Sequence, residues 1–138
     1  YNSALPTVVV PEIAQKCKKH KISINQVESN NQGLMIAEHI EKELQVIGAH
    51  TSIRTKLTTA NKQTKILTQS DYIKKHFFFK HESMYEAGSE YGAAMREMWS
   101  YSQLAKNNHD DFVDGLSQLS ILIQTIVGCK VTAFKRPF

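Results

Sequence analysis

The chain has few of the residues on which small secreted domains depend. Among its 138 residues there are only two cysteines, Cys17 and Cys129, and three prolines. Two cysteines cannot build a disulfide framework or a four-cysteine zinc site, and so low a number is typical of a reducing compartment. The proportions of hydrophobic and charged residues, 41% and 22%, are those of an ordinary globular domain that can bury a core without help.

The chain also lacks a long apolar run. Its longest uncharged stretch, residues 115–129, is interrupted by serine, glutamine and threonine. It falls short of the roughly 20 apolar residues that a membrane span needs. The first residues do not follow the basic, apolar, small-residue order of a signal peptide. The composition therefore predicts a cytoplasmic globular domain.

Several classes of enzyme site are missing as well. The six histidines show no zinc-ligand spacing, and the sequence suggests no histidine partner for either cysteine. No glycine-rich loop that could cradle phosphates occurs, so we expect no ATP site. Zinc, serine and cysteine hydrolases are thus disfavoured.

The charged residues of the chain are separated into a basic region and an acidic region. Its net charge of +4 combines a basic segment, residues 50–81, with an acidic one, residues 82–114. The first holds seven lysines and arginines against one aspartate, and the second holds seven acids against two bases. Cations that hold phosphates beside carboxylates that hold a metal are what a metal-dependent nucleic-acid enzyme requires. Solvated faces of surface helices are the alternative explanation.

The apolar pattern alternates between helix and strand periods. Proline followed by glutamate predicts a first helix from Pro11 to about residue 19. The later elements predicted are a buried strand at 22–28, a helix at 34–47, a strand at 51–57, a basic helix at 62–75, a strand at 77–79, a helix at 85–104, and a last helix whose apolar stripe is Phe112, Leu116, Leu119, Ile123 and Ile126. This order predicts an α/β layered domain over residues 1–128, followed by a tail at 129–138.

Two groups of acids depart from what packing alone would choose. Glu28 ends a predicted buried strand, at the sheet edge where α/β folds collect ligands. Asp110, Asp111 and Asp114 follow His109 at the start of the last helix. Such carboxylates can simply cap a helix or pair with lysine. They repel one another, however, and a divalent cation with a preference for oxygen ligands, such as Mg²⁺ or Mn²⁺, would relieve that repulsion.

Three motifs together resemble one protein family. They are residues 27–33 (VESNNQG), 61–66 (NKQTKI) and 108–114 (NHDDFVD). In this order and spacing they resemble the C-terminal nuclease domain of the phage terminase large subunit, which has an RNase H-like mixed sheet flanked by helices. The resemblance implies a metal-dependent endonuclease that cuts concatemeric double-stranded DNA during viral genome packaging.

The resemblance also implies roles for individual residues. Glu28, Asp110 and Asp111 would be catalytic and hold two divalent cations, Mg²⁺ or Mn²⁺, with Asp114 as a further metal ligand. The residues implied to contact DNA are Lys62, Lys65 and Asn31, and those implied to support the metal ligands are His109 and Asn30. Lys65 stands where the family usually has arginine, which keeps the charge and loses bidentate geometry. The implied partners of the whole protein are the portal and the small terminase subunit, in the cytoplasm of a bacterial host.

One departure from the family concerns the first strand. The RNase H-like site also uses an aspartate on that strand, and residues 1–11 resemble a region that follows it. The resemblance therefore implies a domain that lacks its first strands and one metal ligand, and that is weakly active or inactive alone. Two alternatives stay open: another RNase H-like nuclease, such as a resolvase or transposase core, and a non-catalytic module for DNA binding or portal docking.

Overall fold

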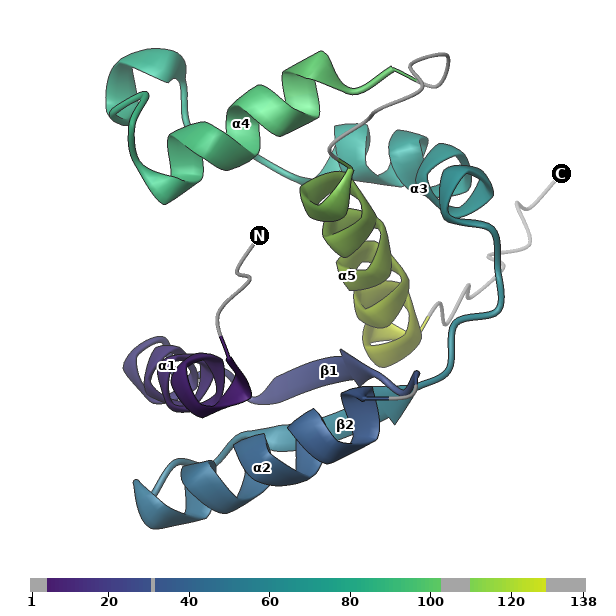
Figure 1. Cartoon of the computed structure of the whole chain (residues 1–138). Coiled ribbons are helices and arrows are strands. Elements are labelled where there is room, and N and C mark those ends of the chain that lie inside the picture. The colour runs from purple at the N-terminus through teal and green to yellow at the C-terminus, as the bar shows by residue number, and fades with distance from the viewer. Residues whose placement is uncertain (1–4, 31, 103–109, 129–138) are drawn as a thin grey trace, which may run out of the picture. The chain divides into compact units, whose positions relative to one another are not determined.

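The structure, a computed structural model, describes residues 5–30, 32–102 and 110–128. It divides into two compact units, Tyr1–Thr59 and Ala60–Phe138, which are described separately (Figure 1). Both helices and strands are present, as the predicted α/β class requires. No helix in the described ranges is long and apolar enough to cross a membrane.

The first unit is a parallel β–α–β arrangement preceded by a helix. Its elements are α1 (Pro6–Lys19), β1 (Ile24–Glu28), α2 (Gly33–Val46) and β2 (Ser52–Lys56). The two strands pair in parallel, with Ile24 opposite Ser52 and Glu28 opposite Lys56. A crossover helix such as α2 is what a parallel pair needs, because a tight turn cannot connect parallel strands.

The core of the first unit lies between its helices. Val10, Ala14 and Cys17 of α1 are buried against Ile40 and Leu44 of α2. Partly buried residues that pack against this core include Val27 of β1 and Ile53 of β2. All five residues of β1 are half-buried, so the prediction of a buried strand there was wrong. Among the described residues only β2 pairs with β1, and a strand in so small a sheet is incompletely covered.

Helix α1 begins earlier than the sequence predicted. Pro6 is its first residue and Pro11 lies inside it. The missing N–H of Pro6 costs nothing at the first helical position, whereas Pro11 loses one helical hydrogen bond. The backbone N–H groups of Val8 and Val9 both donate to the carbonyl of Leu5, which secures the first turn. Burial of the apolar face offsets the bond lost at Pro11.

The second unit is helical in its described part. Its elements are α3 (Lys62–His76), the short 3-10 helix η1 (Glu82–Met84), α4 (Glu90–Ser100) and α5 (Asp111–Val127). Both α3 and α4 pack against α5. The strand predicted at 77–79 does not form. The backbone at Phe77 is extended, yet the described strands number two and both belong to the first unit.

Helix α4 is shorter than the predicted helix at 85–104. Ser89 is its N-cap, and its hydroxyl accepts a hydrogen bond from the Gly92 N–H at 3.1 Å. A Cβ atom at Gly92 would lie 2.5 Å from the Glu86 carbonyl oxygen, so the chain can turn into the helix here only because Gly92 has no side chain. Tyr101 is already extended and ends the helix.

The buried face of α5 is rotated from the predicted apolar stripe. Leu119 and Ile126 are 44% and 46% exposed, whereas Ser117 and Ser120 are fully buried. The two hydroxyls satisfy their hydrogen bonds within the helix, Ser117 with the carbonyl of Val113 and Ser120 with that of Ser117. Ser120 also donates to Gln69 Oε1 of α3 at 2.8 Å. Small hydrogen-bonded side chains therefore face α3, in places that hydrophobicity alone would not select.

Candidate functional site

The first turn of α3 presents a lysine next to the acidic turn of α5. Asn61 caps α3, because its side-chain oxygen accepts hydrogen bonds from the N–H groups of Gln63 at 2.9 Å and Thr64 at 3.4 Å. Asparagine is among the best N-cap residues, since it satisfies N–H groups that have no partner within the helix. The cap fixes Lys62 as the first helical residue. The asparagine of the NKQTKI motif thus has a structural role here.

Lys62 bridges two of the predicted metal ligands. Its Nζ atom lies 2.6 Å from Asp110 Oδ1 and 3.1 Å from Asp111 Oδ1. The Lys62 side chain is 37% exposed, and those of Asp110 and Asp111 are 23% and 50% exposed. A cationic group therefore already lies between the two carboxylates, and one face of it remains open to solvent.

The two carboxylates change the acidity of the ammonium group. Partial burial lowers the pKa of Lys62, but hydrogen bonds and attraction to Asp110 and then Asp111 outweigh it and raise that pKa from 10.5 to about 12. The group is consequently charged at any physiological pH. At the site it acts as a permanent positive charge.

Lys65 and Asp114 form a second, more deeply buried pair. Lys65 Nζ lies 2.6 Å from Asp114 Oδ1, and their side chains are 6% and 15% exposed. Asp114 Oδ1 accepts no directed hydrogen bond, so it is held by charge, while Gln118 donates to Asp114 Oδ2 at 3.1 Å. Lys65 would have to leave this pair to contact DNA. Lys65 is buried because it lies one helical turn from Gln69, on the side of α3 that contacts Ser120 of α5.

The acidic turn of α5 does not cap its own helix. Asp110 occupies the N-cap position, yet its side chain makes no capping hydrogen bond. The N–H of Phe112 instead donates to Glu97 Oε1 of α4. Sequence reasoning did not select Glu97, since no local pattern links it to a helix that starts 14 residues later. Helix capping is therefore not what occupies the Asp110 carboxylate.

The other predicted residues lie elsewhere. Glu28 is half-buried at the end of β1 in the first unit, where Gly33 allows α2 to approach its carbonyl. Asn30 is exposed in the turn that follows. Asn31 and His109 fall outside the described residues. Because Glu28 and the aspartates belong to different units, their participation in one site stays a prediction.

The donor chemistry of the α5 turn fits a divalent cation. Asp110 and Asp111 supply carboxylate oxygens, the ligands that Mg²⁺ and Mn²⁺ prefer, and both already contact a positively charged group. No group of three or more His, Cys, Asp or Glu side chains with metal-binding geometry occurs within the described residues. Occupancy by a cation would require Lys62 to move aside.

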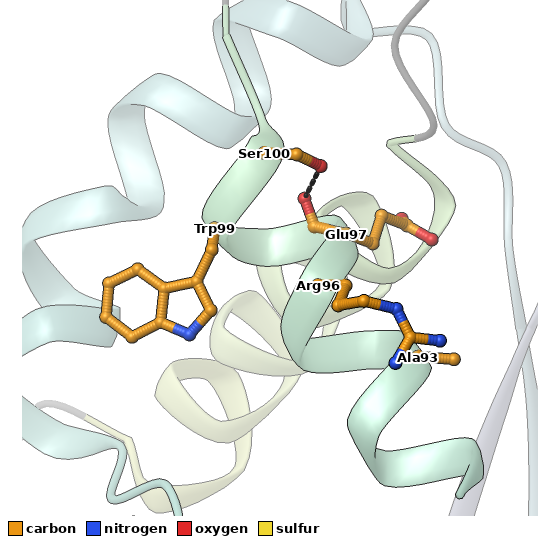
Figure 2. A pocket seen from close by; sticks show the side chains of 5 residues that line it. All are labelled: Ala93, Arg96, Glu97, Trp99 and Ser100. Carbon is orange, nitrogen blue, oxygen red and sulfur yellow. Dashed lines mark hydrogen bonds between the residues drawn. The ribbon is translucent and has the colours of Figure 1, made fainter. Parts of the chain in front are cut away.

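A surface hollow of the second unit lies along α4 and includes Glu97 in its lining. It has a volume of about 720 Å³ and is lined by Ala93, Arg96, Glu97, Trp99 and Ser100 (Figure 2). Its wide opening and its lining by one helix make it a surface depression.

No protein-family model, curated protein or solved structure matches the chain. A functional assignment therefore depends on the residues and geometry described above.

Proposed function

We propose that this chain belongs to a metal-dependent DNA endonuclease of the phage terminase type, with an RNase H-like fold. One observation carries the proposal. Asp110 and Asp111 both contact the Lys62 ammonium group at the start of α5, although neither caps the helix with its side chain. The parallel arrangement of β1, α2 and β2, in which Glu28 is the last residue of β1, is consistent with part of an RNase H-like sheet. The ordered resemblance of the three motifs supports the same assignment.

The proposed roles follow from charge and position. Asp110, Asp111 and Glu28 would hold Mg²⁺ or Mn²⁺, and Asp114 would support the turn through its pair with Lys65. Divalent cations there would supply activation of water and stabilisation of the leaving oxygen in phosphodiester hydrolysis. Lys62 balances the carboxylate charge and, when it moves aside, can pair with a DNA phosphate. Such a contact positions the backbone without reading base sequence.

The substrate proposed is double-stranded DNA, held by the basic residues of the second unit. Lys74, Lys75 and Lys80 are exposed at and beyond the end of α3. In the whole protein the cut would produce genome ends during packaging, together with the portal and the small terminase subunit, in the cytoplasm of a bacterial host. No ATP site is proposed for these 138 residues.

A non-catalytic DNA-binding module is the second candidate, and one observation favours it. Each of the three aspartates already has a lysine partner, so Lys62 and Lys65 compensate two of the three negative charges without a metal. Under this alternative the ion pairs only join α3 to α5. The two candidates differ in whether Mn²⁺ displaces Lys62.

Titration of Mn²⁺ into the ¹⁵N-labelled chain tests the choice. Paramagnetic broadening should reach the amides of Asp111, Phe112 and Glu28 first, and the Lys62 ammonium signal should shift. Asp111→Asn should weaken Mn²⁺ binding by at least on the order of tenfold. Glu82→Gln is the control, because it removes one exposed acid from the same unit and leaves the site intact.

Nicking of supercoiled plasmid by the same chain with Mn²⁺ supplies a second readout. Asp110→Asn and Glu28→Gln should both abolish any nicking and leave plasmid binding unchanged. Equal Mn²⁺ affinity in wild type, Asp111→Asn and Glu28→Gln would overturn the proposal. Plasmid binding without Mn²⁺ binding would establish the non-catalytic module.

A further inference from the structure

The start of α5 is secured by a residue from another helix. The first N–H groups of any helix have no partner within it, and an aspartate at the N-cap normally accepts one of them. In α5 the N–H of Phe112, at the second helical position, donates to Glu97 Oε1 instead. The Asp114 N–H donates to the Asp110 carbonyl at 2.8 Å, so the helix is regular from its first turn.

Glu97 takes an N–H group that the Asp110 side chain would otherwise be placed to accept from. An N-cap carboxylate has two oxygens, which can accept from the N–H groups of its own first turn or from a neighbouring side chain. Here Glu97 occupies the Phe112 N–H, and the Asp110 carboxylate accepts from Lys62 at 2.6 Å. Figure 2 shows the Glu97 side chain on the opposite side of α4 from Trp99. Its half-buried carboxylate is thereby directed to α5 rather than to solvent.

We propose that Glu97 is a positioning residue, which keeps the Asp110 carboxylate away from its own helix and directed to the Lys62 side of the site. Without Glu97, the unpaired Phe112 N–H draws the Asp110 carboxylate into an ordinary N-cap, and Lys62 loses its closer partner. The link to a divalent cation rests on the proposed function. The exchange of the Asp110 partner from Lys62 to the Phe112 N–H does not depend on the proposed function.

The charges around the start of α5 are consistent with different roles for Glu97 and for the two aspartates. Glu97, Asp110 and Asp111 place three acids around one helix start, where the helix dipole favours negative charge. Within the described residues, the acids that pair with Lys62 are Asp110 and Asp111, whereas Glu97 accepts from a backbone N–H. The dipole thus stabilises all three carboxylates, and those of Asp110 and Asp111 pair with the Lys62 ammonium group.

The test compares Glu97→Ala with Glu97→Gln, which retains an oxygen acceptor. In the ¹⁵N-labelled full chain, Glu97→Ala should shift the Phe112 amide signal and abolish the coupling between Lys62 and Asp110. That coupling is measured as a double-mutant cycle of unfolding with Lys62→Met and Asp110→Asn. Glu97→Gln should restore it, and Glu82→Gln should leave it at the wild-type value. Glu97→Met, which preserves side-chain volume, replaces Glu97→Ala if the alanine variant does not fold.

The outcomes separate this inference from the proposed function. Unchanged Lys62–Asp110 coupling in Glu97→Ala and Glu97→Met would overturn the positioning role. If the coupling responds as expected and the wild-type chain binds no Mn²⁺, the positioning role stands and the endonuclease proposal fails. If the wild-type chain does bind Mn²⁺, Glu97→Ala should reduce its affinity on the order of tenfold, as is typical when a residue that orients a metal ligand is lost.

Discussion

Lys62 and Asp110 are joined by a 2.6 Å contact across 48 residues of sequence. The contact ties the first residue of α3 to the N-cap of α5. It also brings the NKQTKI and NHDDFVD motifs into one site, which their separation in the sequence could not show.

The pH dependence of stability should reveal the Lys62 bridge. The pKa of Lys62 is raised on folding from 10.5 to about 12, so its contribution to stability is fully present below pH 10.5 and is lost as the pH rises through about 12. Comparison with a variant that lacks the Lys62 ammonium group isolates its contribution. The measurement is therefore the difference in urea midpoint between wild type and Lys62→Met, which should shrink across that window. A constant difference would show that the bridge is not formed.

Breaking the buried Lys65–Asp114 pair should cost more than breaking the Lys62 bridge. Lys65→Met leaves the mostly buried Asp114 carboxylate without its cation, for which a loss of about 3 kcal/mol in the free energy of unfolding is expected. Lys62→Met affects a partly exposed pair, and a loss of about 0.5 kcal/mol is expected. Urea denaturation of both variants measures which substitution lowers the free energy of unfolding more.

A double variant provides the control for that comparison. Lys65→Met combined with Asp114→Leu removes both charges and should recover most of the stability, because the cost arises from the unpaired buried charge. A double variant no more stable than Lys65→Met would show that packing, not charge, dominates at this position.

Substitution of Gly33 should disrupt the turn next to Glu28. A Cβ atom at Gly33 would lie 1.7 Å from the Glu28 carbonyl oxygen, which is a backbone atom that cannot move alone. Gly33→Ala should therefore lower the free energy of unfolding by about 2 kcal/mol or more, as overpacking does. Thermal unfolding followed by circular dichroism measures the change.

Gly115 offers a matched control within a helix. Nothing lies within 4 Å of a Cβ atom built there. Gly115→Ala in α5 should therefore stabilise the chain by about 0.5–1 kcal/mol, because alanine loses less conformational entropy than glycine in a helix. If Gly33→Ala were as well tolerated as Gly115→Ala, the close approach of α2 to β1 would be contradicted.

Much of the secondary structure followed from local pattern. The helix at Gly33–Val46, the strand at Ser52–Lys56 and the helix at Lys62–His76 lie within one or two residues of their predicted bounds. Periodicity and caps are local properties that a short window contains. The errors arose where tertiary structure decided the outcome: α1 continues through Pro11 with its apolar face buried, and residues 77–79 have no partner strand among the described residues.

The sequence by itself determined the order of these elements, the separation of basic from acidic segments, and the presence of three aspartates at the start of the last helix. Only the tertiary structure decided that Lys65 is buried while Lys62 remains accessible, and that Glu97 rather than Asp110 caps α5. The physical reason is that local patterns act within one helix, whereas tertiary contacts join residues far apart in the sequence. Helical spacing places side chains on faces of a single helix, whereas the partner of a charged group depends on which of those faces meets another helix.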